Sequence, residues 1–302
     1  MNDPTSSSRV DSILRACDFP TSGARVTCAV SGGADSLALL VLARRLGLDV
    51  EAVHVDHGLR PGSAAEAGAV ADACRHLGAT FRAVSVKIAA GPNLEARARE
   101  ARYAALPADV LTGHTADDRA ETVVLNLLRG AGVDGLAGLR PVGGPSGRVR
   151  HPLLALRRAD TEWVCHEAGL IPLQDPSNTD VALLRNRVRH EILPALSAAA
   201  GRDLVPVLVR QADLMADDAD LLDDLAGRLD PTDARAIAVA PLPLARRAVR
   251  RWLTGEHPPD AATVERVLAV ARGEAVACEL PGGDRVSRRN QRLSRNGPSE
   301  QD

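Results

Sequence analysis

Residues 25–46 decide the fold: Arg25-Val-Thr-Cys-Ala-Val30 is followed by Ser31-Gly-Gly-Ala-Asp-Ser36 and then by Leu37-Ala-Leu-Leu-Val-Leu-Ala-Arg-Arg-Leu46. A β-branched run, a glycine-containing turn and an apolar helical run is the order in which α/β proteins build an anion-binding site. The helix N-terminus carries unpaired N–H groups and about half a positive charge, and glycine lets the backbone approach a phosphate closely. The stretch therefore predicts a turn that holds a pyrophosphate group, which we interpret as part of ATP.

The residues predicted to bind the nucleotide through this turn are Ser31, Gly32, Gly33, Ala34, Asp35 and Ser36. The two serines add hydroxyl donors, and Asp35 is the candidate ligand for Mg²⁺, since carboxylate oxygens suit that ion. An ordinary glycine-rich turn between a strand and a helix is the alternative interpretation of the same residues.

Two commoner nucleotide-binding motifs are excluded because the sequence lacks the residues or the preceding strand that they need. A Walker A loop needs a lysine after its second glycine, and the one lysine of the chain, Lys87, follows no such loop. A Gly-x-Gly-x-x-Gly match occurs at Gly130, Gly132 and Gly135, but it follows a helical pattern and no strand. We therefore predict that these glycines end a helix and form a turn.

Composition limits the class of protein. A chain of 302 residues is long enough for two domains, and the net charge of −2 excludes a uniformly basic nucleic-acid-binding protein while allowing local basic patches. The five cysteines are scattered without a Cys-x-x-Cys pair, which argues against a disulfide framework or a zinc site. No apolar segment resembles a secretion signal or a membrane span, so we expect a cytoplasmic protein with no membrane partner.

Strand-like and helix-like runs alternate through the first half of the chain. The expected strands are 25–30, 50–55, 80–86 and 108–112, and the expected helices are 36–46, 63–77, 94–105 and 117–129. This alternation is typical of a parallel sheet with helices on both faces, whose ligands bind at the carboxyl ends of the strands. The predicted fold class is therefore α/β, a doubly wound Rossmann-like sheet followed by a smaller, mainly helical domain.

Three parts are expected along the chain. They are a flexible N-terminal segment (1–22), a nucleotide-binding catalytic domain (23–195) with a loop at Pro141–Gly147, and a helical domain (196–302) with helices over 203–228, 242–253 and 261–271. Two short strands are expected within Ala277–Val286, followed by a basic tail that contains Arg285, Arg288, Arg289, Arg292 and Arg295.

Polar residues at two further strand ends are candidates for the site. His54 and Val55 end the second expected strand beside the turn, where the backbone could contact the adenine edge. Asp118 and Glu121 lie three residues apart in the first turns of a helix and therefore share a face, with His114 just before them. The two acids could bind an amine, hold Mg²⁺ or accept a proton, and stabilisation of the helix N-terminus is the structural alternative.

The segment 184–190 concentrates arginine. Guanidinium groups suit phosphates, so Arg185, Arg187 and Arg189 are predicted to contact nucleic acid or the phosphates of ATP. A solvated amphipathic helix is the alternative interpretation.

Together these segments resemble the tRNA(Ile)-lysidine synthetase family of the PP-loop ATP pyrophosphatases. The resemblance is carried by Ser31–Ser36, His54–Arg60, Asn93–Tyr103, Thr112–Leu136 and Asp175–Pro194. It covers 25–195 densely and the helical remainder only weakly. Within it, Gly-His-Thr-Ala-Asp-Asp and the Arg-Asn-Arg-Val-Arg-His run are the most specific motifs.

The resemblance implies an enzyme that ligates free L-lysine to C2 of the wobble cytidine of tRNA(Ile) with a CAU anticodon, through an adenylated cytidine. ATP and Mg²⁺ would be held by the turn, including Asp35, and Asp118 and Glu121 would orient the lysine amine, with His114 beside them. Arg187 and its neighbours would hold phosphate or tRNA, and 196–302 would be a tRNA-binding domain. A homodimer is compatible with this interpretation.

Two departures from the family pattern stand out. Arg119 occupies the place where the family usually has Gln, and the chain is shorter than long members with a further C-terminal domain, so we regard the arginines of 285–295 as candidate contacts for the tRNA acceptor end. The alternatives are a PP-loop tRNA thiolase, which would need a cysteine pair near the site, and a non-catalytic nucleotide-binding protein.

Overall fold

The computed structural model describes residues 4–56, 63–86, 94–143, 149–174, 180–255 and 258–297. It divides the chain into two compact units, residues 1–213 and 214–302. The boundary lies within helix α10 (Val205–Gly227) and not after residue 195 as expected. The reason is that Val205, at the start of this helix, packs against Ala116 and Ala120 of the first unit.

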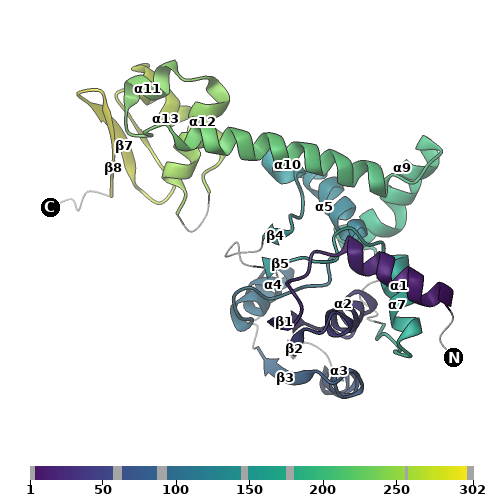
Figure 1. The fold of residues 1–302 in the computed structure, drawn as a ribbon. Coiled ribbons are helices and arrows are strands. Elements are labelled where there is room, and N and C mark those ends of the chain that lie inside the picture. Colours follow the sequence, from purple (N-terminus) through teal and green to yellow (C-terminus); the bar gives the residue numbers. More distant parts are fainter. Residues whose placement is uncertain are drawn as a thin grey trace. The chain divides into compact units, whose positions relative to one another are not determined.

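A parallel sheet forms the centre of the first unit (Figure 1). Its strands are β1 (Arg25–Ala29), β2 (Asp49–Asp56) and β3 (Thr80–Ser85), in that spatial order, with Ala29 paired to Val53. The β-branched runs and the intervening helices produce this arrangement, because parallel neighbours need a crossover connection. The predicted α/β class is confirmed.

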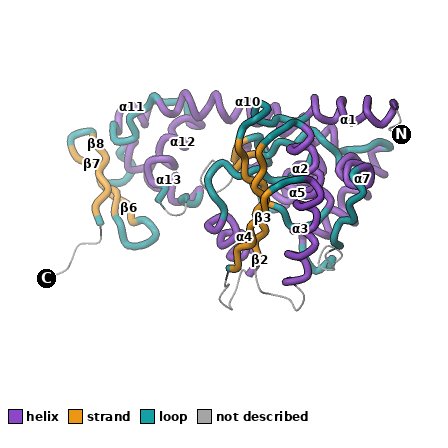
Figure 2. Tube along the Cα trace, turned by 60° about the horizontal axis from the view of Figure 1, so that its bottom comes forward, coloured by secondary structure: helices purple, strands orange, loops and turns teal. Residues whose placement is uncertain are grey.

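Helices cover both faces of the sheet, as Figures 1 and 2 show. One face packs on α2 (Ala34–Arg45) and α3 (Ser63–Leu77), and the other packs on α4 (Leu94–Ala105). Helix α7 (Arg158–Glu167) packs against α2. The core is aliphatic, with Leu39, Leu40 and Leu42 of α2 fully buried. This apolar helix therefore fixes the turn that precedes it against the sheet.

The expected strand 108–112 is reduced to single bridges. Leu111 bridges Cys28 on one side and Arg150 on the other, both in parallel orientation. Asp109 has a φ of 65°, a left-handed conformation that interrupts an extended run. Only the last residues of the segment therefore lie beside β1, but they still bring Thr112 and the residues after it to the carboxyl end of the sheet.

The structure describes a helix from residue 4 within the N-terminal segment that was expected to be flexible. Helix α1 (Pro4–Ala16) buries Val10 and Ile13, which lie three residues apart on one face. The Arg9 guanidinium lies 4.3 Å from the centre of the Trp163 ring and 3.3 Å from a carboxylate oxygen of Asp160. The helix thus packs against α7.

The remaining elements of the first unit surround the carboxyl end of the sheet. They are α5 (Ala116–Leu128), α6 (Val133–Leu136), β4 (Val142–Gly143), β5 (Val149–Arg150), α8 (Leu184–Arg187), the π-helical turn η2 (Val188–Ile192), α9 (Leu193–Ala200) and the start of α10. Gly130, with a φ of 72°, follows the end of α5, as predicted for a helix C-terminus. The expected loop 141–147 is partly a strand, because β4 pairs with β5, and the rest of it lies outside the described residues.

The second unit is helical with a small antiparallel sheet. It contains the rest of α10, α11 (Ala234–Val239), α12 (Leu242–Leu253), α13 (Ala261–Arg272), β6 (Ala277–Glu279), β7 (Arg285–Arg289) and β8 (Arg292–Asn296). The expected basic tail is therefore a β-hairpin, held because Val286 and Leu293 are buried in the core of this unit. In the described part of the chain, no single helix is long and apolar enough to cross a membrane, although the sharply bent pair Leu184–Ala200 and Val205–Gly227 meets the length and composition test together.

Candidate active site

The turn between β1 and α2 is shaped by one hydroxyl group. The buried Ser36 Oγ accepts hydrogen bonds from the backbone N–H groups of Ser31 and Gly32, both at 3.1 Å, and donates to the Gly33 carbonyl at 2.9 Å. Gly33 caps α2 without a side-chain hydrogen bond. The structure thus places Ser31, Gly32, Gly33, Ala34, Asp35 and Ser36 around the N-terminus of α2, where an anion is favoured.

Two glycines are required at this turn, Gly32 by its left-handed backbone conformation and Gly113 by close packing against backbone. Gly32 has a φ of 89°, and a Cβ there would lie 2.6 Å from Leu173 Cδ1. A Cβ on Gly113 would lie 2.5 Å from the backbone oxygen of Asp35, so only glycine lets the segment before α5 approach the turn. Gly113 was not among the predicted site residues.

His54 and Val55 lie at the carboxyl end of β2. The last pair between β1 and β2 is Ala29–Val53, so the following residues of β2 extend beyond the end of β1 beside the turn. His54 is 3% exposed, and its Nδ1 donates a hydrogen bond to the Val30 carbonyl at 2.9 Å. The His54 side chain is therefore a packed residue, and contact of this strand end with adenine stays a prediction.

Helix α5 presents Asp118 and Glu121 on one face, as their spacing predicted. Thr115 caps the helix, and the Asp118 Oδ2 accepts hydrogen bonds from the Thr115 N–H at 2.9 Å and its hydroxyl at 3.1 Å. Glu121 is 1% exposed. A buried carboxylate requires compensating positive charge, which arginines supply here.

Two arginines of the 184–190 segment contact these acids. Arg185 donates from Nε to Glu121 and from Nη2 to Asp118, both at 3.1 Å, and the Arg189 Nε lies 2.6 Å from Glu121. Residues four apart share a helical face, whereas Arg187, two residues from each, is exposed and is not brought to the acids. The proposed role of Arg187 in holding phosphate or tRNA stays a prediction.

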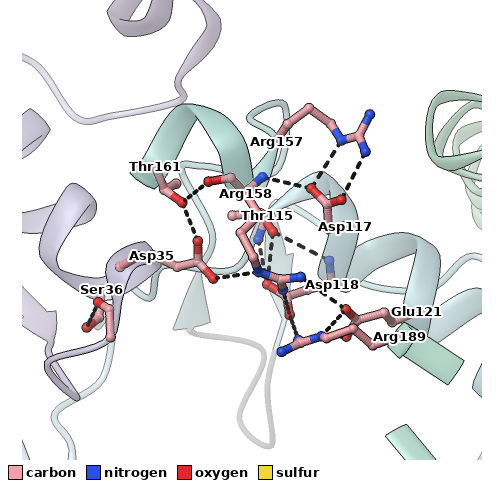
Figure 3. Close-up of polar contacts among 12 residues, drawn as sticks. Asp35, Ser36, Thr115, Asp117, Asp118, Glu121, Arg157, Arg158, Thr161 and Arg189 are labelled. Carbon is pink, nitrogen blue, oxygen red and sulfur yellow. Dashed lines mark hydrogen bonds and ion pairs between the residues drawn. The ribbon is translucent and has the colours of Figure 1, made fainter. Parts of the chain in front are cut away.

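The start of α7 supplies site residues that the sequence did not reveal (Figure 3). The Arg158 guanidinium lies between the two halves of the site, with nitrogens 3.7 Å from Asp35, 3.6 Å from Asp118 and 3.5 Å from Glu121. The buried Thr161 hydroxyl lies 2.5 Å from Asp35 Oδ1. These residues follow Asp35 by more than 120 positions, and no spacing pattern links them to it.

The two aspartates of the site have opposite pKa shifts. Burial raises the pKa of Asp35 to about 6, although the Thr161 hydroxyl lowers it. Burial acts in the same direction on Asp118, but His114, Arg185 and the Thr115 N–H outweigh it and lower the pKa of Asp118 to about 2. Asp118 is therefore ionised at neutral pH and suited to bind a cation.

His114 lies among polar neighbours before α5. Its Nδ1 is 2.8 Å from the Thr112 hydroxyl and 3.1 Å from Nδ1 of His151, and the two rings meet edge to face. His151 is buried and also contacts the Thr112 hydroxyl, at 2.6 Å. The structure therefore places His114 beside Asp118 as expected and adds His151 as a neighbour that sequence reasoning missed.

Other predicted residues lie elsewhere. Arg119, the departure from the family pattern, is buried and pairs with Asp213 at 2.6 Å, so it does not join the acids of the site. The motif residues His57–Arg60, Asn93 and 175–179 lie outside the described residues.

The donor set limits what kind of metal the site could hold. Among the described residues, no group of three or more His, Cys, Asp or Glu side chains is placed to bind a metal ion. Magnesium in nucleotide sites is bound by one or two carboxylates together with phosphate oxygens and water. Asp35, at the turn predicted to bind phosphate, fits that arrangement, whereas a cage made by protein side chains alone does not.

Comparisons with known proteins identify the family of the chain. The PP-loop domain family matches residues 3–196. The chain is 44% identical over 248 residues to the tRNA(Ile)-lysidine synthase of Nocardia farcinica (78% of this chain, 77% of the relative), and 40% identical over 309 residues to that of Streptomyces coelicolor (92% and 87%).

A solved structure supports the fold. The U34-tRNA thiolase NcsA from Methanococcus maripaludis superposes with a TM-score of 0.54 at 17% identity, over 70% of this chain and 79% of that one. At this identity the similarity concerns the fold alone. Because the family match covers most of the first unit and the relatives align along most of their length, the chain belongs to the PP-loop proteins and, within them, to the tRNA(Ile)-lysidine synthase family.

Proposed function

We propose that this protein is a ligase that joins L-lysine to C2 of the wobble cytidine of a CAU-anticodon tRNA(Ile), with ATP as the energy source. The cytidine O2 attacks the α-phosphorus of ATP, and the bond to the β-phosphate breaks as diphosphate leaves. The ε-amine of lysine then attacks C2, and AMP leaves with O2. Family membership and the site geometry support this reaction.

The observation that carries the proposal is the pair of acids, Asp118 and Glu121, in the same site as the phosphate-binding turn. Both are buried, and a single guanidinium, that of Arg158, lies within 3.7 Å of both of them and of Asp35. An ammonium group is the natural ligand of such a pair of carboxylates, and the turn would accept the triphosphate. The two substrates thus meet in one place, and catalysis consists mainly of positioning and electrostatic stabilisation.

Magnesium would be held by Asp35 together with the phosphates. When bound, the ion neutralises negative charge on the triphosphate. The carboxylate of Asp35 is suited to this, since its Oδ1 is fixed by Thr161 while Oδ2 has the more distant Arg158 as a partner. A homodimer remains our prediction for the assembly, and sedimentation of the purified protein tests it.

A PP-loop thiolase is disfavoured by the state of the cysteines. Sulfur transfer needs a reactive thiolate, which is favoured by exposure and positive charge. Burial raises the pKa of the Cys17, Cys28 and Cys165 thiols to about 12 and that of Cys74 to about 11. Cys278 lies in the second unit, and burial raises its pKa as well.

The test is incorporation of labelled lysine into an unmodified CAU-anticodon tRNA transcript with ATP and Mg²⁺. We expect label in the tRNA with release of AMP and diphosphate, and its absence would overturn the proposal. Asp118→Asn is expected to abolish transfer while binding of ATP persists. Asp72→Asn, at an exposed carboxylate paired with Arg75, is the matched control and should leave the rate unchanged.

A further inference from the structure

Asp117, the neighbour of Asp118 in α5, faces helix α7 instead of the other acids (Figure 3). Its carboxylate accepts hydrogen bonds from the Arg157 Nε at 3.1 Å, the Arg157 Nη2 at 3.0 Å and the backbone N–H of Arg158 at 2.8 Å. Paired bonds between a guanidinium and a carboxylate fix both groups in one geometry. Asp117 therefore connects the first turn of α5 to the first turn of α7.

The backbone of Arg158 is held at both ends. Its N–H is bound by Asp117, and its carbonyl accepts a hydrogen bond from the Thr161 hydroxyl at 2.8 Å. The preceding N–H, that of Arg157, donates to the Asp160 side chain at 3.1 Å. The backbone of Arg158 is therefore fixed between the two halves of the site, and only its side chain can change conformation.

The Arg158 guanidinium differs from the other arginines of the site in how it is bound. Its distances of 3.5–3.7 Å to Asp35, Asp118 and Glu121 exceed the ordinary range of about 2.7–3.2 Å for a hydrogen bond. Arg189 and Arg185, in contrast, make hydrogen bonds of 2.6 and 3.1 Å to Glu121. Arg158 is thus attracted by three carboxylates without a short hydrogen bond to any of them. Its guanidinium can therefore reorient towards a ligand without breaking such a bond.

We propose that Arg158 contacts the α-phosphate of ATP and that Asp117 is the residue that positions it. This inference rests on the proposed function, in which the α-phosphorus is bonded to the cytidine O2 and lies two bonds from the carbon that the amine attacks. A group that lies between the phosphate-binding turn and the amine-binding acids is therefore next to this phosphorus. Negative charge grows there as diphosphate and later AMP depart, and a guanidinium stabilises it.

The experiment is a double-mutant cycle of Asp117→Asn and Arg158→Ala. Arg158→Ala is expected to lower the rate of lysidine formation about 100-fold, the size typical for loss of one group that stabilises transition-state charge. Asp117→Asn is expected to lower it about 10-fold, because Arg158 remains but is displaced. The double variant should match Arg158→Ala alone, since Asp117 acts through that residue.

Three further measurements separate positioning from simple folding. With Asp117 present, Arg158→Lys should have a higher rate of lysidine formation than Arg158→Ala. Combined with Asp117→Asn, Arg158→Lys should be little faster than Arg158→Ala. Affinity for a non-hydrolysable ATP analogue with Mg²⁺ should fall in both single variants in the absence of tRNA and lysine. Asp203→Asn is the control. Asp203 is half exposed, pairs with the Arg157 nitrogen that does not bind Asp117 and accepts a hydrogen bond from the Val205 N–H, so the rate of this variant should stay within about twofold of wild type.

Defined outcomes overturn the inference. If the losses of the two single variants multiply in the double variant, Asp117 does not act through Arg158. If folded Arg158→Ala has an unchanged rate of lysidine formation or an unchanged affinity for the ATP analogue, Arg158 does not contact the α-phosphate. Should Asp117→Asn fail to fold, Asp117→Glu keeps the charge at a shifted position and takes its place in the cycle. Absence of lysidine formation by the wild-type protein would instead contradict the proposed function, and the analogue affinities would still test Arg158.

Discussion

The Ser31–Ser36 turn and the acid–arginine cluster are two halves of one site that are built in different ways. In the turn, Ser36 organises backbone groups within five residues of itself, and the contacts involve neutral hydroxyl, N–H and carbonyl groups. In the cluster, Glu121 of α5 meets Arg185 and Arg189 from more than 60 residues away. A turn of this kind is specified by contiguous sequence, whereas the cluster exists only once α5, α7, α8 and η2 have packed.

The same contrast separates Asp35 from Asp118. Asp118 is buried and Asp35 is partly buried, but Asp118 has an N–H donor and several cations close to it, and so its pKa falls to about 2 while that of Asp35 rises to about 6. The lowered pKa of Asp118 stabilises the fold above about pH 4, and this contribution is lost as the pH falls towards 2. The raised pKa of Asp35 has the opposite sign, since its contribution is full below about pH 4 and is lost as the pH rises through 6.

The largest effect should come from breaking the cluster at Glu121. Glu121→Gln removes the buried charge that Arg158, Arg185 and Arg189 share. We expect a loss of about 3 kcal/mol in the free energy of unfolding, the usual cost of an uncompensated buried charge, and lysidine formation about 1,000-fold slower. Denaturant unfolding and the labelled-lysine assay measure the two effects.

Glu51→Gln is the matched control for this variant. Glu51 makes a partly exposed ion pair with Arg82 at 3.1 Å, which contributes about 0–1 kcal/mol. If Glu121→Gln proved no more destabilising than Glu51→Gln, the cluster would not depend on charge compensation, and the contrast with the turn would fail.

Asp35→Asn sharpens the comparison between the two aspartates. The variant should bind ATP with Mg²⁺ about 100-fold more weakly, because the carboxylate that we propose to hold the ion is lost. Without ligands it should nevertheless be more stable than wild type above pH 6, by about 2 kcal/mol, since a partly buried charge is removed. Thermal unfolding at pH 7.5 and pH 4.5 checks the sign: a gain is expected at the higher pH and little change at the lower one.

Asp118→Asn should change the stability of the fold in the opposite direction to Asp35→Asn. Removing a carboxylate whose pKa is lowered should destabilise the fold at neutral pH. A gain in thermal stability from Asp118→Asn, or a loss from Asp35→Asn at pH 7.5, would contradict the opposite environments assigned to the two groups.

Gly113→Ala tests the contact between the halves. Its Cβ would lie 2.5 Å from the Asp35 carbonyl oxygen, so the segment before α5 must move away from the turn. We expect the free energy of unfolding to fall by about 2 kcal/mol, measured by denaturant unfolding, and the coupling between ATP binding and lysine binding to weaken. Gly68→Ala is the control within the same unit: nothing lies within 4 Å of that Cβ, and alanine in the exposed interior of α3 should stabilise it by about 0.5–1 kcal/mol.

The elements that the sequence predicted well are those whose pattern is contiguous. Helix α3 has the expected bounds, and the acids of α5 share a face as their spacing required. The strand at 108–112 was overestimated because apolar composition does not reveal the left-handed φ of Asp109. The helix at the N-terminus was missed because a serine-rich start hid the apolar pair Val10 and Ile13.

The part of the site that could not be predicted comes from α7. Arg157, Arg158 and Thr161 look like ordinary surface and helix residues in sequence, and their partners lie 40 or more positions away. A spacing rule can report on neighbours along one helix or strand, but it cannot show which helix packs on which. Arg187 illustrates the same limit: composition selected the arginine run, while helical geometry selects Arg185 and Arg189 for the acids.

The smallest effect is expected in the turn itself. Ser36→Ala leaves the N–H groups of Ser31 and Gly32 without their hydroxyl acceptor, at a cost of about 1–2 kcal/mol in the ligand-free protein. Phosphate oxygens can accept from the same N–H groups, so ATP with Mg²⁺ should restore much of the lost thermal stability. Ser85→Ala, at the exposed end of β3, should change neither value. If ATP does not reduce the stability loss, the phosphate oxygens do not replace the Ser36 hydroxyl as acceptor. The turn, like the cluster, would then have a purely structural dependence on its internal contacts.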